Sequence, residues 1–289
     1  MITLFTTPKE FSGIFDIIQT NALNSWRIIS PEIQILVIGN SKGSKEVAAS
    51  ITAEFIPEVG CSSDGVPLIN KLFSIAQSQA KYPIIAYVNA DILLPPNLLE
   101  VISLLQKIRS NFLAVGSRWD LDVNTAINFA RNDDTTSFWE HAKNNAQKHR
   151  PAGIDYFIYN KTLWNNIPPL AIGRFGWDNW LLWKARRLGV PLINVTECIF
   201  AVHQNHGYNF HNYTNKASLK KSKDVLRNKA IIKDNKLTLR DTNWKIKNGK
   251  ISKNSSNEFR MRNLKTLQKI YPELKYLFKV YRRLKMNNY

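Results

Sequence analysis

An amide and a carboxylate follow a near-continuous apolar run. Asn89 and Asp91 come directly after Ile84–Val88, a segment typical of a strand that is covered on both faces. Oxygen ligands two positions apart suit a hard divalent ion that also holds phosphate oxygens and keeps several waters. The same residue types form a helix N-cap at a strand-to-helix turn. Both interpretations stay open on this motif alone.

Two histidines follow a second apolar run. His203 comes directly after Ile199–Val202, and His206 lies three residues further along. An imidazole can join a carboxylate as a ligand when the ion is manganese-like. Ligands bind beyond the carboxyl ends of strands in open α/β sheets, so we expect His203 to point into that crevice. The alternative is a pair of loop histidines that make ordinary hydrogen bonds.

Three further carboxylates are candidates for proton transfer or for an alternative metal site. Asp178 begins a helical pattern, where it can accept a proton as a general base or only cap the helix. Asp120 and Asp122 form a literal Asp-x-Asp and are an alternative metal pair. Otherwise this segment lines the ligand crevice with Arg118 near an anionic group, or Arg118 pairs with Asp120 and only organises the loop.

The segments that must position these residues alternate between strand and helix patterns. Apolar runs predict strands at Ile2–Thr6, Ile33–Ile38, Pro83–Val88 and Phe112–Val115, and helical spacing predicts helices at Val47–Ala53, Leu68–Ala80 and Asn97–Ile108. This alternation predicts an α/β fold with a mostly parallel sheet and helices on both faces. The chain has no Gly-rich dinucleotide fingerprint, phosphate loop, Gly-x-Ser-x-Gly elbow or metalloprotease His pair. Nicotinamide enzymes, P-loop kinases and common hydrolases are therefore disfavoured.

The order of several short motifs resembles that of GT-A-type nucleotide-sugar glycosyltransferases. Asn89-Ala90-Asp91 resembles the Asp-x-Asp region of that family. The other matching segments, in chain order, are Ile2–Lys9, Ile33–Asn40, Ala152–Tyr156, Gly176–Trp180 and Val202–His206. Together they cover about residues 1–213. Asn89 replaces the first acid of the family motif, and the loss of one negative charge is expected to weaken metal affinity. A metal-independent variant therefore stays open.

The resemblance implies a GT-A (Rossmann-like) fold and a role for each matching residue. Asp91, His203 and His206 are expected to hold Mn2+ or Mg2+, and Asp178 is the expected general base of an inverting transfer. The residues expected to bind the donor are Thr6, Thr7, Asn40, Asn70, Lys71, Asn89, Arg118, Gly153 and Asp155. Trp177, Asn179 and Trp180 are expected to contact the acceptor, although the two tryptophans also fit a core. The implied donor is a nucleoside-diphosphate sugar, most often UDP-linked, and the implied acceptor is a glycan or a lipid-linked molecule.

Charge divides the chain near residue 213. Residues 214–289 hold 22 basic residues (Lys and Arg) and 5 acidic residues (Asp and Glu). Residues 1–213 hold 18 basic and 17 acidic residues. We therefore predict a GT-A domain at 1–213 and a basic C-terminal extension at 214–289. Within the extension, polar and apolar residues alternate on both sides of Asn248-Gly249, which predicts a small hairpin. After Asn257, apolar residues recur every three or four positions, which predicts an amphipathic helix.

The basic extension has several possible partners. It can pack on the main domain, bind an anionic membrane surface, or bind nucleic acid, which we regard as the weakest of the three. No transmembrane stretch or signal peptide is evident, and the 2 cysteines lie 137 positions apart, so we expect a cytoplasmic protein, peripheral at the inner membrane face if the extension binds lipid.

The sequence leaves two classes of function in competition. The first is a metal-assisted glycosyltransferase. The alternative is a catalytically inactive GT-A-like module that binds an acidic polymer, a lipid surface or nucleic acid through its basic extension. A nucleotidyltransferase is disfavoured, because no Gly-rich loop bearing Lys or Arg follows the first strand.

Overall fold

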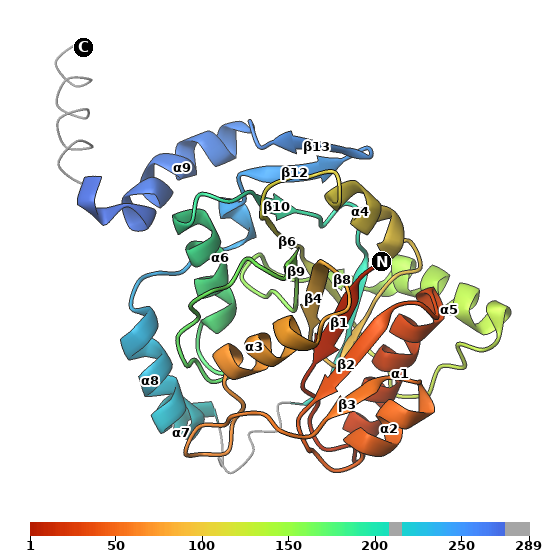
Figure 1. Cartoon of the computed structure of the whole chain (residues 1–289). Coiled ribbons are helices and arrows are strands. Elements are labelled where there is room, and N and C mark those ends of the chain that lie inside the picture. Colours follow the sequence, from red (N-terminus) through yellow and green to blue (C-terminus); the bar gives the residue numbers. More distant parts are fainter. Residues whose placement is uncertain (208–215, 275–289) are drawn as a thin grey trace, which may run out of the picture.

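A large mixed sheet forms the centre of the molecule (Figure 1). The structure, a computed structural model, describes residues 1–207 and 216–274. In spatial order the nine strands are β13 (Lys250–Lys253), β12 (Trp244–Lys247), β10 (Leu192–Asn194), β6 (Leu113–Val115), β9 (Tyr156–Asn160), β4 (Ile84–Val88), β1 (Thr3–Thr6), β2 (Gln34–Ile38) and β3 (Glu54–Ile56). All of them run in one direction except β9 and β13, which are antiparallel to their neighbours. The predicted mostly parallel sheet is confirmed.

Helices cover both faces of this sheet. The helices are α1 (Ile14–Ile29), α2 (Ser44–Ser50), α3 (Ile69–Gln79), α4 (Leu98–Leu105), α5 (Asn132–Asn145), α6 (Trp177–Arg187), α7 (Lys216–Lys220), α8 (Lys223–Ile232) and α9 (Asn257–Ile270), with short 3-10 turns η1 (Leu239–Asp241) and η2 (Pro272–Leu274). One buried cluster joins the sheet to α1, α2 and α4, and a second joins it to α3, α6, α8 and α9. The strands between them are apolar on both sides for this reason.

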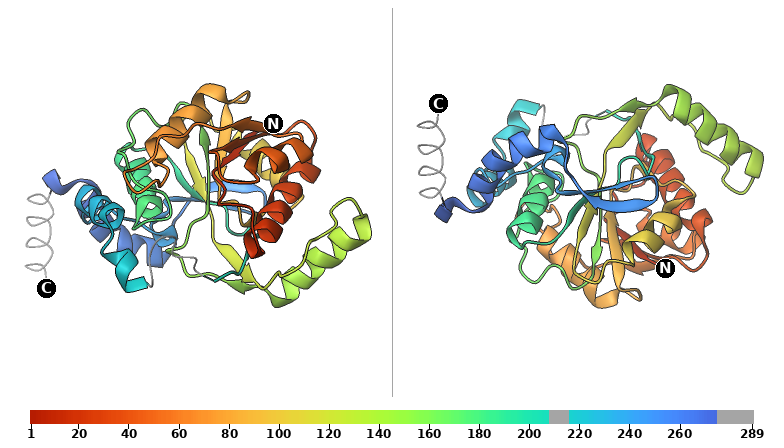
Figure 2. Two further views of the ribbon diagram at one scale, coloured as in Figure 1. Left: turned by 90° about the horizontal axis from the view of Figure 1, so that it is seen from below. Right: turned by 90° about the horizontal axis from the view of Figure 1, so that it is seen from above.

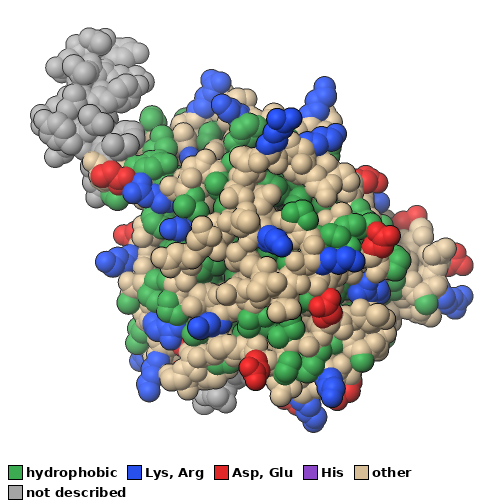
Figure 3. All heavy atoms as spheres, viewed as in Figure 1, with side chains coloured by type: hydrophobic (Ala, Val, Ile, Leu, Met, Phe, Trp, Pro, Cys, Tyr) green, Lys and Arg blue, Asp and Glu red, His purple; other side chains and the backbone are tan. Residues whose placement is uncertain are grey.

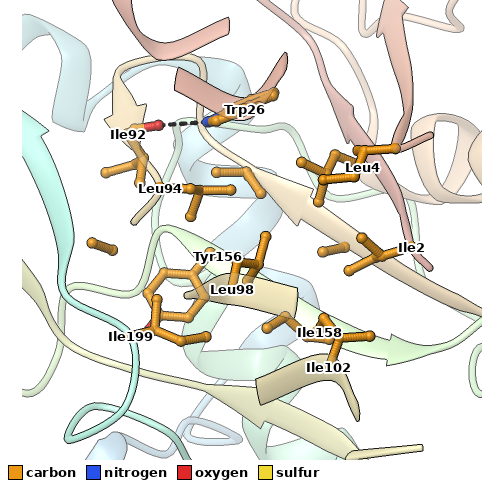
Figure 4. Close-up of a cluster of buried hydrophobic side chains, with 14 of the residues drawn as sticks. Ile2, Leu4, Trp26, Ile92, Leu94, Leu98, Ile102, Tyr156, Ile158 and Ile199 are labelled. Carbon is orange, nitrogen blue, oxygen red and sulfur yellow. Dashed lines mark hydrogen bonds between the residues drawn. The ribbon is translucent and has the colours of Figure 1, made fainter. Parts of the chain in front are cut away.

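One indole links the first cluster to the loop that carries Asp91. Trp26 of α1 is fully buried, and its Nε1 donates a hydrogen bond to the carbonyl oxygen of Ile92 at 2.8 Å (Figure 4). Because a buried indole N–H needs a partner, this contact fixes the chain directly after Asp91.

A second, smaller sheet lies at the carboxyl ends of the main strands. Its order is β5 (Ile92–Leu93), β11 (Ala201–Gln204), β7 (Arg118–Leu121) and β8 (Gln147–Lys148). A third apolar cluster, which includes Leu93, Val202 and Trp139, packs this sheet against α5. Helix α5 projects from the rest of the molecule in both views of Figure 2. The sequence patterns predicted neither this sheet nor its register.

The basic extension is part of the main fold. Strand β12 pairs in parallel with β10, and β13 turns back on β12 through Asn248-Gly249. Ile246 joins the first buried cluster, while Leu237, Leu239 and Ile270 join the second. The predicted hairpin and helix are therefore both present, as β12–β13 and α9. The change in charge near residue 213 does not coincide with a break in packing, and the boundary residue itself lies outside the described ranges.

Within residues 1–207 and 216–274, no helix combines the length and the apolar character that are needed to cross a bilayer.

Shared packing of the extension and the main sheet makes a testable stability prediction. Ile246 is 1% exposed, and truncating it to alanine is expected to destabilise the whole protein by about 2–5 kcal/mol through lost contacts and a cavity. Denaturant unfolding followed by both fluorescence and circular dichroism should show one transition at a lower midpoint. Lys247→Ala, at the next, exposed position, is the control. A normal midpoint for Ile246→Ala would show that the extension unfolds independently.

Candidate active site

The register of the small sheet assembles a group of carboxylates and imidazoles. In this sheet β11 lies between β5 and β7, and His203 is opposite Ile92 on one side and Asp120 on the other. Asp91 is the residue before Ile92, and its carbonyl oxygen accepts a hydrogen bond from the backbone N–H of Gln204. Asp91 and Asp120 therefore approach His203 from opposite sides.

Asp91, His203 and His206 form a compact cluster of potential metal ligands. Asp91 Oδ2 lies 3.1 Å from His206 Nε2 and 3.7 Å from His203 Nε2. One ligand atom from each residue lies within 4.8 Å of the other two. The second oxygen of Asp91, Oδ1, is buried and has no hydrogen-bond partner among the described residues. A carboxylate and two imidazoles suit Mn2+, and an orphaned buried oxygen is what a missing cation would leave. The predicted ligands are thus brought together, and their role stays a prediction.

The protonation states of this cluster also suit a cation. Burial raises the pKa of Asp91, but the hydrogen bond from His206 and the charges of both histidines and Lys9 lower it to about 2. Burial lowers the pKa of His203, despite the opposing charge of Asp91. An ionised carboxylate beside a neutral imidazole is the form that binds metal.

A buried polar chain runs from the core to this cluster. Tyr87 donates its hydroxyl hydrogen to Asn89 Oδ1 at 2.7 Å, and Asn89 Nδ2 donates to Asp155 Oδ1 at 2.6 Å. Arg118 then bridges two carboxylates, with Nη1 2.7 Å from Asp155 Oδ2 and Nε 2.9 Å from Asp120 Oδ1. Asn89 therefore holds Asp155 with a neutral amide, at the position where the Asp-x-Asp motif that this segment resembles has an acid.

His149 closes the other end of this chain. Its Nδ1 lies 2.5 Å from Asp120 Oδ2. Gly153 is packed so closely on this ring that a Cβ there would lie 2.4 Å from His149 Cδ2. A larger residue at position 153 would have to push this ring aside, so glycine leaves room for the imidazole that binds Asp120.

Asp178 lies at the start of α6 and has an unusual proton affinity. Gly176, in the left-handed conformation with φ 68°, turns the chain into the helix, and Asp178 is partly exposed in its first turn. Burial raises the pKa of Asp178, two backbone N–H groups lower it, and the negative charge of Asp155 raises it further, to about 7. A carboxyl with this pKa can exchange a proton near neutral pH.

The remaining predicted donor residues lie at the ends of β1 and β2 and at the start of α3. Thr6 ends β1, and its buried hydroxyl has no partner among the described residues; the same holds for Asn70 Oδ1 in α3. Thr7 is partly buried, whereas Asn40 and Lys71 are exposed. The structure brings none of these five into contact with the Asp91 cluster.

The two tryptophans expected to contact an acceptor lie in the core, which is the alternative that the sequence also left open. Trp177 and Trp180 are 5% and 6% exposed and belong to the second buried cluster. Trp177 packs edge-on against Tyr87, with ring centroids 5.5 Å apart. Their faces are therefore covered by protein. Asn179 is also engaged, because its Nδ2 donates to the carbonyl oxygen of Ala152 at 3.2 Å.

The two carboxylates of the alternative metal pair are each engaged by other side chains. Asp120 is taken by Arg118 and His149, while Asp122 accepts a hydrogen bond from Asn205 at 2.8 Å. The two carboxylates thus have different partners, and neither belongs to the ligand cluster found in the described ranges. The predicted Arg118–Asp120 ion pair is present, together with the pairing to Asp155.

Sequence reasoning missed three residues of the site. Tyr87 lies two positions before Asn89, so the two-residue period of a strand could have placed both side chains on one face. Lys9 contributes charge at Asp91 and lies 4.2 Å above the Phe15 ring. His149 had no detectable signal, because it contacts Asp120 through an antiparallel pairing of β7 and β8.

Comparison with known proteins finds similarity in structure alone. No family model matches the sequence, and no curated protein matches it. Glucosyl-3-phosphoglycerate synthase from Mycobacterium tuberculosis, in complex with Mn2+, UDP-glucose and phosphoglyceric acid, is 13% identical, with a TM-score of 0.49 over 81% of this chain and 79% of that one. S. aureus TarS 1-349 in complex with UDP-GlcNAc is 13% identical, with a TM-score of 0.33 over 42% of this chain and 35% of that one. Similarity at this level assigns no role to any residue of this chain.

The raised pKa of Asp178 predicts a pH-dependent stability effect. The carboxyl keeps its proton up to about pH 7 when folded but loses it near pH 4 when unfolded, so its contribution to stability falls between those values. Asp178→Asn removes the cost of the ionised form. We expect this variant to raise the melting temperature above that of the wild type at pH 8 and to match the wild type only at about pH 3.5, where the carboxyl is protonated in both states.

Asp133→Asn, an exposed first-turn acid of α5, is the matched control. An equal effect of Asp178→Asn at both pH values would contradict the raised pKa.

Proposed function

We propose that this protein is a GT-A glycosyltransferase that moves a sugar from a nucleoside-diphosphate donor, UDP-linked, to a hydroxyl of a glycan or lipid-linked acceptor. The observation that carries the proposal is the cluster of Asp91, His203 and His206 at the carboxyl edge of a mostly parallel sheet, with a buried carboxylate oxygen that lacks a partner. Ligand sites in sheets of this type lie at that edge.

Asp91, His203 and His206 would hold the divalent ion, Mn2+ in preference to Mg2+ because two ligands are imidazoles. The ion would neutralise the charge that develops on the departing diphosphate. The protein's own part is to keep these ligands in position. The β5–β11 pairing sets Asp91 beside His203, and Asp120 lies 3.2 Å from His203 Nδ1, on the far side of the ring from Asp91.

Asp178 is the proposed base of an inverting transfer. With a pKa of about 7, it is ionised in a large share of molecules at neutral pH and still has useful affinity for the proton of an acceptor hydroxyl. Asp155 is held by Asn89 and Arg118 within electrostatic range of Asp178. We propose that Arg118 and Asn89 position Asp155, and that Asp155 contacts hydroxyls of the donor sugar.

Nucleotide-dependent stabilisation tests the proposal. UDP at about 100 times its dissociation constant should stabilise the fold by roughly 2.7 kcal/mol, and the melting temperature should rise only when Mn2+ is present. Asp91→Ala should abolish the effect of Mn2+, because it removes the charged ligand. His141→Ala, which removes an exposed histidine of α5, should leave the effect intact.

The same thermal-shift panel includes GDP, ADP and CMP, so it also identifies which nucleobase the protein recognises. A rise with UDP that does not need Mn2+ would contradict the metal site. No rise with any nucleotide would overturn the transferase proposal and favour a module that binds its partner through the basic extension.

The extension is proposed to hold the enzyme at an anionic membrane surface, on the cytoplasmic side. Met261 and Leu264 are 72% and 48% exposed on α9 and lie three residues apart, on one side of the helix. Arg260 and Lys265 flank them. Lys and Arg side chains also project along the edge formed by α9 and the β12–β13 hairpin (Figure 3). Apolar residues between cations suit a bilayer interface better than bulk water.

Vesicle sedimentation tests the membrane proposal. The wild-type chain should sediment with phosphatidylglycerol vesicles and not with phosphatidylcholine vesicles, because the attraction is both electrostatic and apolar. Replacing Met261 and Leu264 by serine should weaken the binding several-fold, while Leu226→Ser, an equally exposed leucine of α8, should not. Tighter binding to duplex DNA or RNA than to anionic vesicles would instead favour a nucleic-acid partner.

A further inference from the structure

A cavity lies where the basic extension meets the main sheet. It has a volume of about 240 Å³ and opens to solvent. Its walls come from the ends of β6, β8 and β10, from η1 and β12, and from the first turn of α9. Its polar lining includes Lys148, His149, Asn194, Thr196, Arg240 and Lys245. Pockets for drug-sized ligands are larger, roughly 300–1,000 Å³, so this cavity suits a small molecule or one end of a larger one.

The charge balance in the cavity favours an anion. Two acids also line it, but each has a basic partner: Glu258 lies 3.8 Å from Arg240, and Glu197 lies 4.0 Å from Lys247 outside the cavity. Lys148 and Lys245 have no carboxylate within 4 Å in the part of the chain that the structure describes. Lys245 is half-buried in the wall, where an unpaired ammonium is less well hydrated than at the surface.

The cavity is adjacent to the candidate active site on two sides. His149 lines the cavity, and its imidazole also binds Asp120 of the carboxylate and histidine network. Pro151 and Leu239 line it too, and the backbone N–H of Leu239 donates to the carbonyl oxygen of Pro151. Asn179, the residue after Asp178, is hydrogen-bonded to the residues next to this contact. Its Nδ2 donates to the carbonyl oxygen of Ala152, and its carbonyl oxygen accepts from the backbone N–H of Leu237. The cavity and the start of α6 therefore share the same supporting segments.

We propose that this cavity binds an anionic group, phosphate or carboxylate, and that the group belongs to the acceptor. Lys148 and Lys245 supply the positive charge, and Asn194 and Thr196 supply the uncharged polar wall. The assignment to the acceptor rests on the proposed glycosyl transfer, whereas the anion site itself does not. The extension would then contribute a strand to the sheet and also complete a binding site beside Asp178, the proposed general base.

Anion titrations of the full chain without nucleotide test the site. Inorganic phosphate is expected to shift the backbone amide NMR signals of Thr196, Thr242 and Asn254. Lys245→Ala should weaken phosphate binding roughly tenfold, as expected for the loss of one charge-assisted contact, and Lys245→Arg should restore most of it. Lys250→Ala is the matched control, because Lys250 is an exposed lysine of the adjacent strand β13 and lies outside the cavity.

Glycerol 3-phosphate serves as a second probe. Binding tighter than that of inorganic phosphate, with the same dependence on Lys245, supports an organic anion such as an acceptor. Equal affinities support a site that recognises the anionic group alone. Shifts that spread over the β12–β13 hairpin, with an equal loss in Lys250→Ala, would overturn the proposal in favour of general surface charge, as would the absence of any shift.

The result can be separated from the nucleotide experiment. Lys245→Ala should still show the Mn2+-dependent stabilisation by UDP. If the wild-type chain binds phosphate but no nucleotide, the transferase proposal is overturned and the anion-site proposal is retained.

Discussion

The alignment of three short strands around β11 is the constraint on which the site depends. His203 is opposite Asp120 in β7, and Asp91 directly precedes its partner in β5. Strand side chains alternate between faces, so a slip of one residue would turn His203 away from both carboxylates. The apolar cluster beneath the sheet and the hydrogen bond from Trp26 to Ile92 hold this alignment. Packing remote from the polar groups thereby determines which of them meet.

Much of the main sheet could be predicted from local pattern, because β1, β2, β4 and β6 are apolar runs between helices. The chain positions of Asp91, His203 and His206 could be predicted too, since each follows such a run. The small sheet could not, because its strands have two to four residues and form only through pairings distant in sequence. Strand β9 was also missed. It runs against its neighbours, and no short pattern encodes strand direction.

The tryptophans beside Asp178 show a limit of reasoning from motifs. Aromatic residues next to a carboxylate fit both sugar stacking and core packing, and only the orientation of α6 distinguishes the two. Here α6 directs Trp177 and Trp180 into the sheet-facing cluster and leaves Asp178 at its partly exposed start. Burial is the dominant effect on the pKa of that carboxyl.

The parallel pairing of β12 with β10 has a consequence during synthesis. A ribosome completes β10 about fifty residues before it reaches β12, and until then one edge of the main sheet presents unpaired amide and carbonyl groups. An open strand edge is a template for pairing with another chain, and domains of this size pass through partly folded states. The late, lysine-rich strand therefore acts as an intramolecular cap. Its charges disfavour the close approach of a second nascent chain carrying the same segment.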